Sequence, residues 1–237
     1  MPNSSTAQSP NHPITQSPVL AIIGGTGKEG NALAFRFARA GVHVLIGSRD
    51  AAKAQNAANE MNARLGAAAG RVEGFSNRDA AAKADIVLLS VPYAGIQSIL
   101  EDLRAAAQNK IVINIASSLN PERKSRAKIP AAGSVTAEVQ QFFGDSTKVV
   151  AAFQNISPEK LEAVDEKIDS DVLVCGGDKA ARETVIALIR QIGIDALDAG
   201  VLANAVAAEA LTAVLIAVNI KYKVKGAGIR ITGVPRG

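Results

Sequence analysis

The segment Gly25-Thr26-Gly27-Lys28-Glu29-Gly30 constrains the fold more than any other part of this 237-residue chain. It follows a short apolar run, Val19–Ile23, and opens a stretch of helical periodicity, Lys28–Ala40, which Gly41 ends. The spacing is G-x-G-x-x-G, and between a buried strand and a helix this spacing is typical of dinucleotide-binding folds. The sequence therefore predicts a strand, a phosphate-binding turn and a helix in this order.

Each glycine of the motif has its own expected role. Gly25 suits the tight turn out of the strand, and Gly27 lets the backbone approach a pyrophosphate closely. Gly30 allows the helix to pack tightly on the sheet. The free N–H groups at the start of the helix would then hold the pyrophosphate, because the helix dipole favours an anion at that end.

Strands and helices alternate along the rest of the chain. Apolar runs bounded by turn residues predict strands, and amphipathic stretches predict helices. The predicted strands are Val19–Ile23, Val42–Ile46, Asp85–Val91, Lys110–Ala116, Lys148–Phe153, Asp171–Cys175 and Asp195–Asp198. The predicted helices are Lys28–Ala40, an Ala-rich helix capped by Asp50, Asn77–Ala84, Ile96–Ala107, Ser134–Phe143, a short one opened by Ser157, and Lys179–Ile192. This alternation predicts an α/β fold with a doubly wound parallel sheet, as in Rossmann domains.

The composition divides the chain into three expected parts. Residues 1–17 are rich in Ser, Asn, Gln and Pro and predict a disordered tail. Residues 18–155 form the expected dinucleotide-binding domain, and residues 156–237 a smaller α/β domain. The tail lacks the apolar run of a secretory signal, so we expect a cytoplasmic protein.

The smaller domain ends in a nearly continuous apolar stretch, Val201–Ile220. A membrane span is one interpretation, because about 20 apolar residues can cross a bilayer. Asn204, Glu209 and Asn219 interrupt the stretch, and a charge at mid-span costs about 2.5–3.5 kcal/mol. We therefore expect a long buried helix at a subunit interface and no contact with a membrane.

The end of the second predicted strand indicates which dinucleotide is bound. NAD-dependent proteins usually carry an acidic residue there for the ribose hydroxyls, whereas this chain has Gly47-Ser48-Arg49. A hydroxyl and a guanidinium can bind a 2′-phosphate by charge-assisted hydrogen bonds, and Lys53 adds a second positive charge. Asp50 fits a helix N-cap better than a ribose partner. These residues favour NADP.

Ser90-Val91-Pro92 closes the predicted strand Asp85–Val91 at the same edge of the sheet. Ligands of open α/β sheets lie beyond the carboxyl ends of the strands, so we expect this segment to border the nicotinamide. Tyr93 follows it, and a role in the site and a role in surface packing are equally compatible with its position.

No acid–base machinery is evident in the sequence. One Cys and two His argue against a disulfide framework and against a multi-His or Cys-based metal centre. His43 lies within a predicted strand and Cys175 beside two glycines, so both favour structural roles. Aromatic residues make up 3% of the chain, which disfavours stacking on single-stranded nucleic acid. The pattern suits hydride transfer between two cofactors, with no catalytic residue beyond those that position them.

Several stretches resemble the NADPH-dependent coenzyme F420 reductases. These are GGTGKEG, GSR, SVPY, AGSVTAE, VVAAFQNIS, DSDVLVCGGD, LDAGVLANA, EALTAVLIAVN and GAGIRITG. The resemblance implies a homodimer, with a deazaflavin cleft between the two domains. By position it places NADP on Thr26 to Gly30, Ser48, Arg49, Lys53 and Val91. It places the deazaflavin ring near Ala116-Ser117-Ser118, Gln154-Asn155 and Leu202.

The sequence departs from this family at two places in the expected acceptor pocket. The family often has His where Gln154 stands, and a Pro-Leu pair where Ser117-Ser118-Leu119 stands. Reduction of another small acceptor, such as a flavin, ferric chelate, imine or carbonyl compound, is therefore the alternative activity. A nucleotide-sensing module without turnover is a third interpretation, which the second domain disfavours.

The net charge of +4 is concentrated near the end of the chain. The residues from Ala210 onward contain five basic and no acidic side chains: Lys221, Lys223, Lys225, Arg230 and Arg236. Together with the loop Arg123-Lys124-Ser125-Arg126, they are candidates to hold the anionic tail of a deazaflavin. A solvated basic surface without a ligand is the alternative.

Overall fold

The computed structural model describes residues 18–66 and 69–235, which build one eight-stranded sheet. The strand order is β3-β2-β1-β4-β5-β6-β7-β8. The strands are β1 (Leu20–Ile23), β2 (Val44–Ser48), β3 (Val72–Ser76), β4 (Ile86–Leu89), β5 (Ile111–Asn114), β6 (Lys148–Ala151), β7 (Val172–Gly176) and β8 (Ala196–Asp198). From β3 to β6 all neighbours are parallel, and β7 pairs antiparallel with β6. The predicted doubly wound α/β fold is confirmed.

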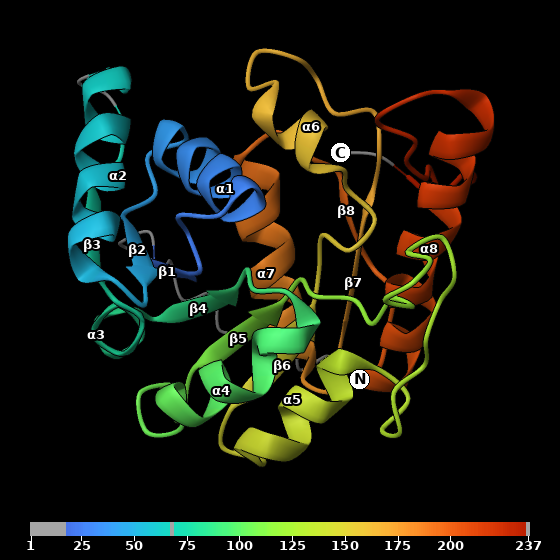
Figure 1. The fold of residues 1–237 in the computed structure, drawn as a ribbon, viewed down its shortest axis with the longest axis horizontal. Helices are drawn as coiled ribbons and strands as arrows, with labels where there is room; N and C mark the ends of the chain where they lie inside the picture. Colours follow the sequence, from blue (N-terminus) through green and yellow to red (C-terminus); the bar gives the residue numbers. More distant parts are fainter. Residues whose placement is uncertain (1–17, 67–68, 236–237) are drawn as a thin grey trace, which may run out of the picture.

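Helices cover both faces of the sheet (Figure 1). They are α1 (Lys28–Arg39), α2 (Ala51–Arg64), α3 (Asn77–Lys83), α4 (Tyr93–Leu103), α5 (Val135–Phe143), α6 (Pro158–Glu162), α7 (Lys179–Gln191) and α8 (Ala205–Tyr222). One core lies under α1, α2, α6 and α7, and the other under α3, α4 and α5. Because the chain leaves β1 toward β2 and returns to β4 on the other side, the strand order reverses at β1. This is where such sheets bind ligands.

Side chains cap most of the helices. Asp50 accepts a hydrogen bond from the backbone N–H of Lys53, as predicted, and Ser76, Ser134, Ser157 and Asp178 cap α3, α5, α6 and α7 in the same way. Such caps satisfy N–H groups that have no partner within the helix. In α1 the N-cap is Gly27, and no side chain of the described residues caps it. The first turn of α1 is therefore open to an external anion.

The structure differs from the sequence-based prediction at one edge of the sheet. Strand β3 was not predicted, because V-E-G-F-S mixes polar and small residues at an edge position where one face stays partly exposed. Strand β2 begins at Val44, so His43 precedes it rather than lying within it. The His43 Nε2 atom is 2.8 Å from Glu73 Oε1, across the junction of β2 and β3. This contact fits the structural role predicted for His43.

Residues after β6 extend the same sheet through β7 and β8. The domain boundary proposed near residue 155 falls between β6 and β7 and stays a prediction, and the predicted tail, 1–17, lies outside the described residues. A short 3-10 helix, Leu202–Asn204, leads into α8. Gly228 lies so close to Ser170 that a Cβ atom there would overlap its hydroxyl. The segment after α8 therefore docks against the start of β7.

The predicted long apolar helix is confirmed as α8, but the rest of the chain covers only one side of it. Ala205, Ala208, Glu209, Ala213 and Leu215 are buried. Large apolar side chains elsewhere on it are exposed, namely Val214, Ile220 and Tyr222. Among the described residues, Leu202–Tyr222 is the one helix long and apolar enough to cross a bilayer by length and composition, which core helices of other proteins also satisfy.

Candidate functional site

The glycine-rich turn is built around close backbone contacts. Gly24 has a φ of +75°, and a Cβ atom there would lie 2.5 Å from the Ser90 carbonyl oxygen. The left-handed residue of the tight turn is Gly24, and Gly25 lies in the same turn. A Cβ at Gly25 would meet the Ile22 carbonyl oxygen at 2.8 Å, and one at Gly30 would meet the Gly24 carbonyl oxygen at the same distance. The turn therefore presses α1 against the ends of β1 and β4.

Charged residues at the first turn of α1 face α6 as well as the turn. Lys28 Nζ lies 3.1 Å from Glu159 Oε1 and 3.3 Å from Glu162 Oε2. These carboxylates raise the pKa of Lys28. Burial, with the negative charge of Glu159 as a second cause, raises the pKa of Glu29 to about 7. A phosphate at this turn would bind to the backbone N–H groups of α1, since the Lys28 ammonium already has two partners.

The carboxyl end of β2 presents polar side chains beside this turn. Ser48 is buried, and its Oγ atom accepts a hydrogen bond from the backbone N–H of Asp50 at 3.2 Å. Arg49 and Lys53 are both exposed. The Asp50 carboxylate caps α2, so it is not directed to a ribose. The arrangement leaves two cations beside the ribose position expected for the adenosine half of a dinucleotide.

Ser90 and Val91 follow β4 directly alongside the glycine turn. The Ser90 N–H donates to the Ile23 carbonyl oxygen at 2.9 Å. Pro92 is the N-cap of α4, and Tyr93 is the first residue of that helix. Burial and the nearby Glu138 carboxylate raise the pKa of the Tyr93 hydroxyl. The segment Ser90–Pro92 thus borders the turn from the other side of the reversal point.

The end of β5 is held by a buried amide. The Asn114 Nδ2 atom donates to the Ala116 carbonyl oxygen and to Thr136 Oγ1, both at 3.0 Å, and Asn114 Oδ1 accepts from the Ala116 N–H at 3.2 Å. Ser117 Oγ lies 2.8 Å from Thr212 Oγ1. Ser118 Oγ is buried without a hydrogen-bond partner in the described residues. The predicted Ala116, Ser117 and Ser118 therefore sit on a fixed backbone.

Gln154 and Asn155 follow β6 and lie beside this segment. Gln154 Nε2 donates to the Asn114 carbonyl oxygen at 2.8 Å, and Asn155 Nδ2 donates to the Asp171 carbonyl oxygen. The side-chain oxygens Gln154 Oε1 and Asn155 Oδ1 are buried, and no partner for them is found among the described residues. Buried polar atoms normally have partners, so these oxygens are available to a ligand or to water.

Two further residues predicted for the acceptor side, Leu202 and Arg230, lie in the second half of the chain. Leu202 begins the 3-10 helix ten residues before Thr212, about 15 Å away along a helical path. The role of Leu202 in the acceptor pocket stays a prediction. Arg230 is engaged with Asp169 at 3.0 Å and with Asp195 at 3.2 Å, so it anchors the segment after α8 rather than an anionic ligand. Arg236 lies outside the described residues.

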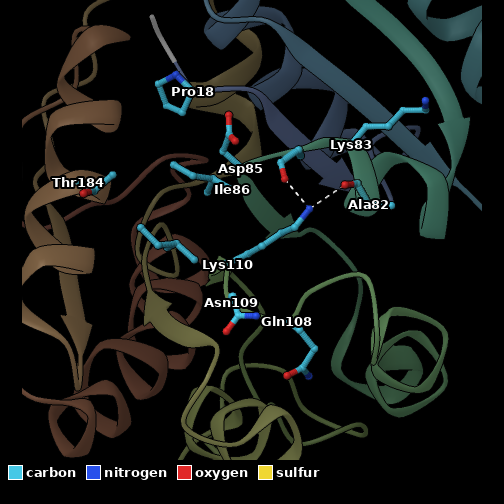
Figure 2. A pocket seen from close by; sticks show the side chains of 11 residues that line it. Pro18, Ala82, Lys83, Asp85, Ile86, Gln108, Asn109, Lys110 and Thr184 are labelled. Atoms are coloured by element: carbon cyan, nitrogen blue, oxygen red, sulfur yellow. Dashed lines mark hydrogen bonds between the residues drawn. The ribbon is translucent and has the colours of Figure 1, made fainter. Parts of the chain in front are cut away.

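A separate hollow lies at the opposite, amino-terminal edge of the sheet. Figure 2 shows Pro18, Asp85 and Lys110, which precede β1, β4 and β5. The Lys110 ammonium donates to the carbonyl oxygens of Ala81, Ala82 and Ala84 at the end of α3. Its donors are thus used within the fold, and the hollow lies away from the glycine turn.

Sequence reasoning missed the residues that support this site. Asn114, Thr136 and Thr212 were passed over because they lie in apolar or helical segments and belong to no catalytic or ligand-binding motif. Glu209 was noted only as an interruption of an apolar helix, although a charge in such a segment usually has a specific partner. The positive φ of Gly24 was not predicted, because the motif spacing does not say which glycine adopts it.

The carboxyl ends of β1, β2, β4, β5 and β6 together form one continuous edge. At one side this edge offers an uncapped helix start and cations, which suit the phosphates of a dinucleotide. At the other side it offers buried amide and hydroxyl oxygens, which suit a flat polar ring. Two ligands bound side by side along this edge could exchange a hydride directly.

Comparisons with known proteins agree with this arrangement. A family model described as NADP oxidoreductase coenzyme F420-dependent matches residues 19–118. The chain is 42% identical over 220 residues to the F420-dependent NADP reductase of Methanocaldococcus jannaschii, covering 90% of this chain and 97% of that protein. It is 40% identical over 222 residues to the enzyme of the same name from Methanothermobacter thermautotrophicus, covering 91% and 95%.

Among solved structures, a putative F420-dependent NADP reductase from Arthrobacter sp. FB24 superimposes with a TM-score of 0.76 at 25% identity, covering 91% of this chain and all of that one. The likeness to the archaeal proteins extends over nearly the full length of both chains, so it includes the elements that carry the site. The chain belongs to the family of F420-dependent NADP reductases.

Proposed function

We propose that this protein is an oxidoreductase that transfers a hydride between NADP(H) and coenzyme F420. The observation that carries the proposal is the shared edge of the sheet, where an uncapped glycine turn lies beside buried polar atoms at the ends of β5 and β6. Membership of the reductase family supports the same pairing of substrates.

The residues of the first half fit NADP. In this proposal the turn from Gly25 to Gly30 holds the pyrophosphate through backbone N–H groups, because no side chain of the described residues occupies the start of α1. Arg49 and Lys53 bind the 2′-phosphate, and Ser48 adds a hydroxyl. Ser90, Val91, Pro92 and Ala116 line the nicotinamide half. NADP(H) supplies the hydride chemistry, and the chain supplies position and electrostatics.

The second pocket lies at Ser117, Ser118, Gln154 and Asn155. These residues bring oxygen atoms together near the end of β5, and they orient the ring of the acceptor beside the nicotinamide. Direct hydride transfer requires the two reacting carbons to lie about 3–3.5 Å apart, so the catalytic contribution of the chain is chiefly positioning. No residue is required to move a proton at this stage.

The protein works in this proposal as a cytoplasmic homodimer. The exposed apolar side chains of α8 support the second copy, because Val214, Ile220 and Tyr222 would leave water at a symmetric interface. Leu202, at the start of the 3-10 helix that leads into α8, contributes to the acceptor pocket in this proposal.

Absorbance of the deazaflavin tests the proposal directly. Purified protein with NADPH and oxidised F420 should bleach the visible band of F420, and the initial rate should saturate in both substrates. Intact NADPH binding without bleaching would refute F420 as the acceptor. That result would favour another small acceptor, one with polar groups that the amide of Gln154 can bind.

A further inference from the structure

The first three turns of α8 contain two polar side chains, Glu209 and Thr212, in an otherwise apolar sequence. They are three residues apart and therefore lie on the same side of the helix. Glu209 is 4% exposed although it carries a carboxylate. Burying a charge costs free energy unless the surroundings compensate it.

Glu209 receives three hydrogen bonds from the start of α5. Its Oε2 atom accepts from the Val135 N–H at 2.8 Å, and its Oε1 atom accepts from the Thr136 N–H at 2.9 Å and from Thr136 Oγ1 at 2.7 Å. All three partners are donors, so they require oxygen acceptors on both sides of the carboxyl group. The side-chain amide of a glutamine at this position would point its NH2 group at one of these donors.

The Glu209 carboxylate also fixes the direction of a longer hydrogen-bond chain. Because the Thr136 hydroxyl gives its single proton to Glu209, it can only accept from Asn114 Nδ2. The other N–H of the same amide then points to the Ala116 carbonyl oxygen, and Asn114 Oδ1 holds the Ala116 N–H. Glu209 thereby orients the backbone that enters Ser117.

Thr212 acts on the same segment by a second route. Its hydroxyl donates to the Gln154 carbonyl oxygen at 2.8 Å, which uses its single proton. The contact of 2.8 Å between Thr212 Oγ1 and Ser117 Oγ must then have Ser117 as the donor. Ser117 is thus left with lone pairs only, and the main chain of Gln154 is tied to α8.

We propose that Glu209 and Thr212 are positioning residues for the acceptor side of the hydride-transfer site. They act from α8 through Asn114, Ala116, Ser117 and Gln154, and neither reaches the glycine turn. The inference rests on the proposed function, because it assigns these residues to the pocket of the second substrate. It predicts that disturbing them weakens the use of F420 and leaves NADPH binding intact.

Thr212→Val and Thr212→Ser form the first test pair. Valine keeps the volume and removes the hydroxyl, whereas serine keeps the hydroxyl. We expect Thr212→Val to lower kcat/KM for F420 at least tenfold, with the Kd of NADPH, measured by fluorescence titration, changed less than twofold. Thr212→Ser should restore most of the loss. Thr184→Val on α7 is the matched control, since the Thr184 hydroxyl donates to the Ala180 carbonyl oxygen in its own helix.

Glu209→Gln is the second variant, with Glu183→Gln as its control, since Glu183 is exposed and pairs with Lys179 on the surface. We expect it to lower kcat/KM for F420 by about the same factor as Thr212→Val, again without a change in NADPH affinity. If the variant does not fold, the Thr212 pair still decides the matter.

The outcomes distinguish a failure of the proposed function from a failure of this inference. A wild-type protein that binds NADPH but does not reduce F420 refutes the proposed function, and this inference with it. An active wild type whose Thr212→Val variant keeps its kcat/KM for F420 refutes the inference alone. Equal losses for F420 and NADPH would also refute it, because they indicate a general structural role.

Discussion

Glu29 gives the prediction with the clearest magnitude. Its carboxyl group lies at the first turn of α1, partly buried and near Glu159, and its pKa rises from 4.5 to about 7. Between these values the folded state keeps a proton that the unfolded state has released. The free energy of unfolding therefore falls as pH rises through this interval.

The size of the effect follows from the interval. At about 1.4 kcal/mol per pH unit, the rise from 4.5 to about 7 corresponds to about 3 kcal/mol of stability lost above pH 7. Below pH 4.5 both states hold the proton, and the loss disappears. Glutamine cannot ionise, so Glu29→Gln should avoid it. The variant should match the wild type near pH 4.5 and be more stable by about 3 kcal/mol at pH 8.

Urea unfolding of both proteins at pH 5, 6, 7 and 8 measures this difference directly. Other groups titrate alike in the two proteins, so their contributions cancel in the comparison. Glu183→Gln on the surface of α7 controls for the loss of an acidic side chain. A stability difference between Glu29→Gln and wild type that is the same at pH 5 and pH 8 would refute the reasoning.

Three further changes test other parts of the site. Arg49→Ala should raise the KM for NADPH about 10–100-fold, because the charge-assisted hydrogen bonds to the 2′-phosphate are lost, and should barely change the KM for NADH. Equal losses for the two nucleotides in steady-state assays would contradict this prediction. Gly30→Ala should lower the free energy of unfolding in urea by about 1–3 kcal/mol and weaken NADPH binding. The added Cβ atom would lie 2.8 Å and 2.9 Å from backbone atoms of Gly24 and Gly25. An unchanged Kd for NADPH would contradict this prediction. Arg36→Met should lower the free energy of unfolding by about 3 kcal/mol, because three carbonyl oxygens lose their hydrogen bonds from the buried guanidinium. A decrease of less than about 1 kcal/mol would contradict this prediction.

The sequence predicted the elements whose residues obey a local rule. The apolar runs of β1, β4 and β5 and the N-caps of α2 and α6 follow from short stretches of chain, and the structure confirms them. Strand β3 was missed because an edge strand has no continuous apolar pattern. The positive φ of Gly24 was not predicted because Gly24 is constrained by Ser90, which lies far away in the sequence.

The candidate site divides in the same way. The glycine turn and the Ser48-Arg49 pair could be found from the sequence because phosphate binding uses adjacent residues. The acceptor side depends on Asn114, Thr136, Glu209 and Thr212, which are up to 98 positions apart and meet only in the folded chain. Without the pairing of β5 with β6, nothing in the local sequence relates Asn114 to Gln154.

Side chains on one side of α1 fix the position of the glycine turn relative to the acceptor side of the site. Lys28, Arg36 and Arg39 recur at a spacing that places them on the same side of the helix, and all three contact α6 or the residues just after it. The Arg36 guanidinium is 7% exposed and donates to carbonyl oxygens at the end of α6 over 2.7–2.8 Å. Backbone carbonyls in fixed directions allow far less sliding than an apolar contact would. The helix that begins at the glycine turn is therefore held in register with the second half of the chain, and direct hydride transfer over about 3–3.5 Å requires such a register.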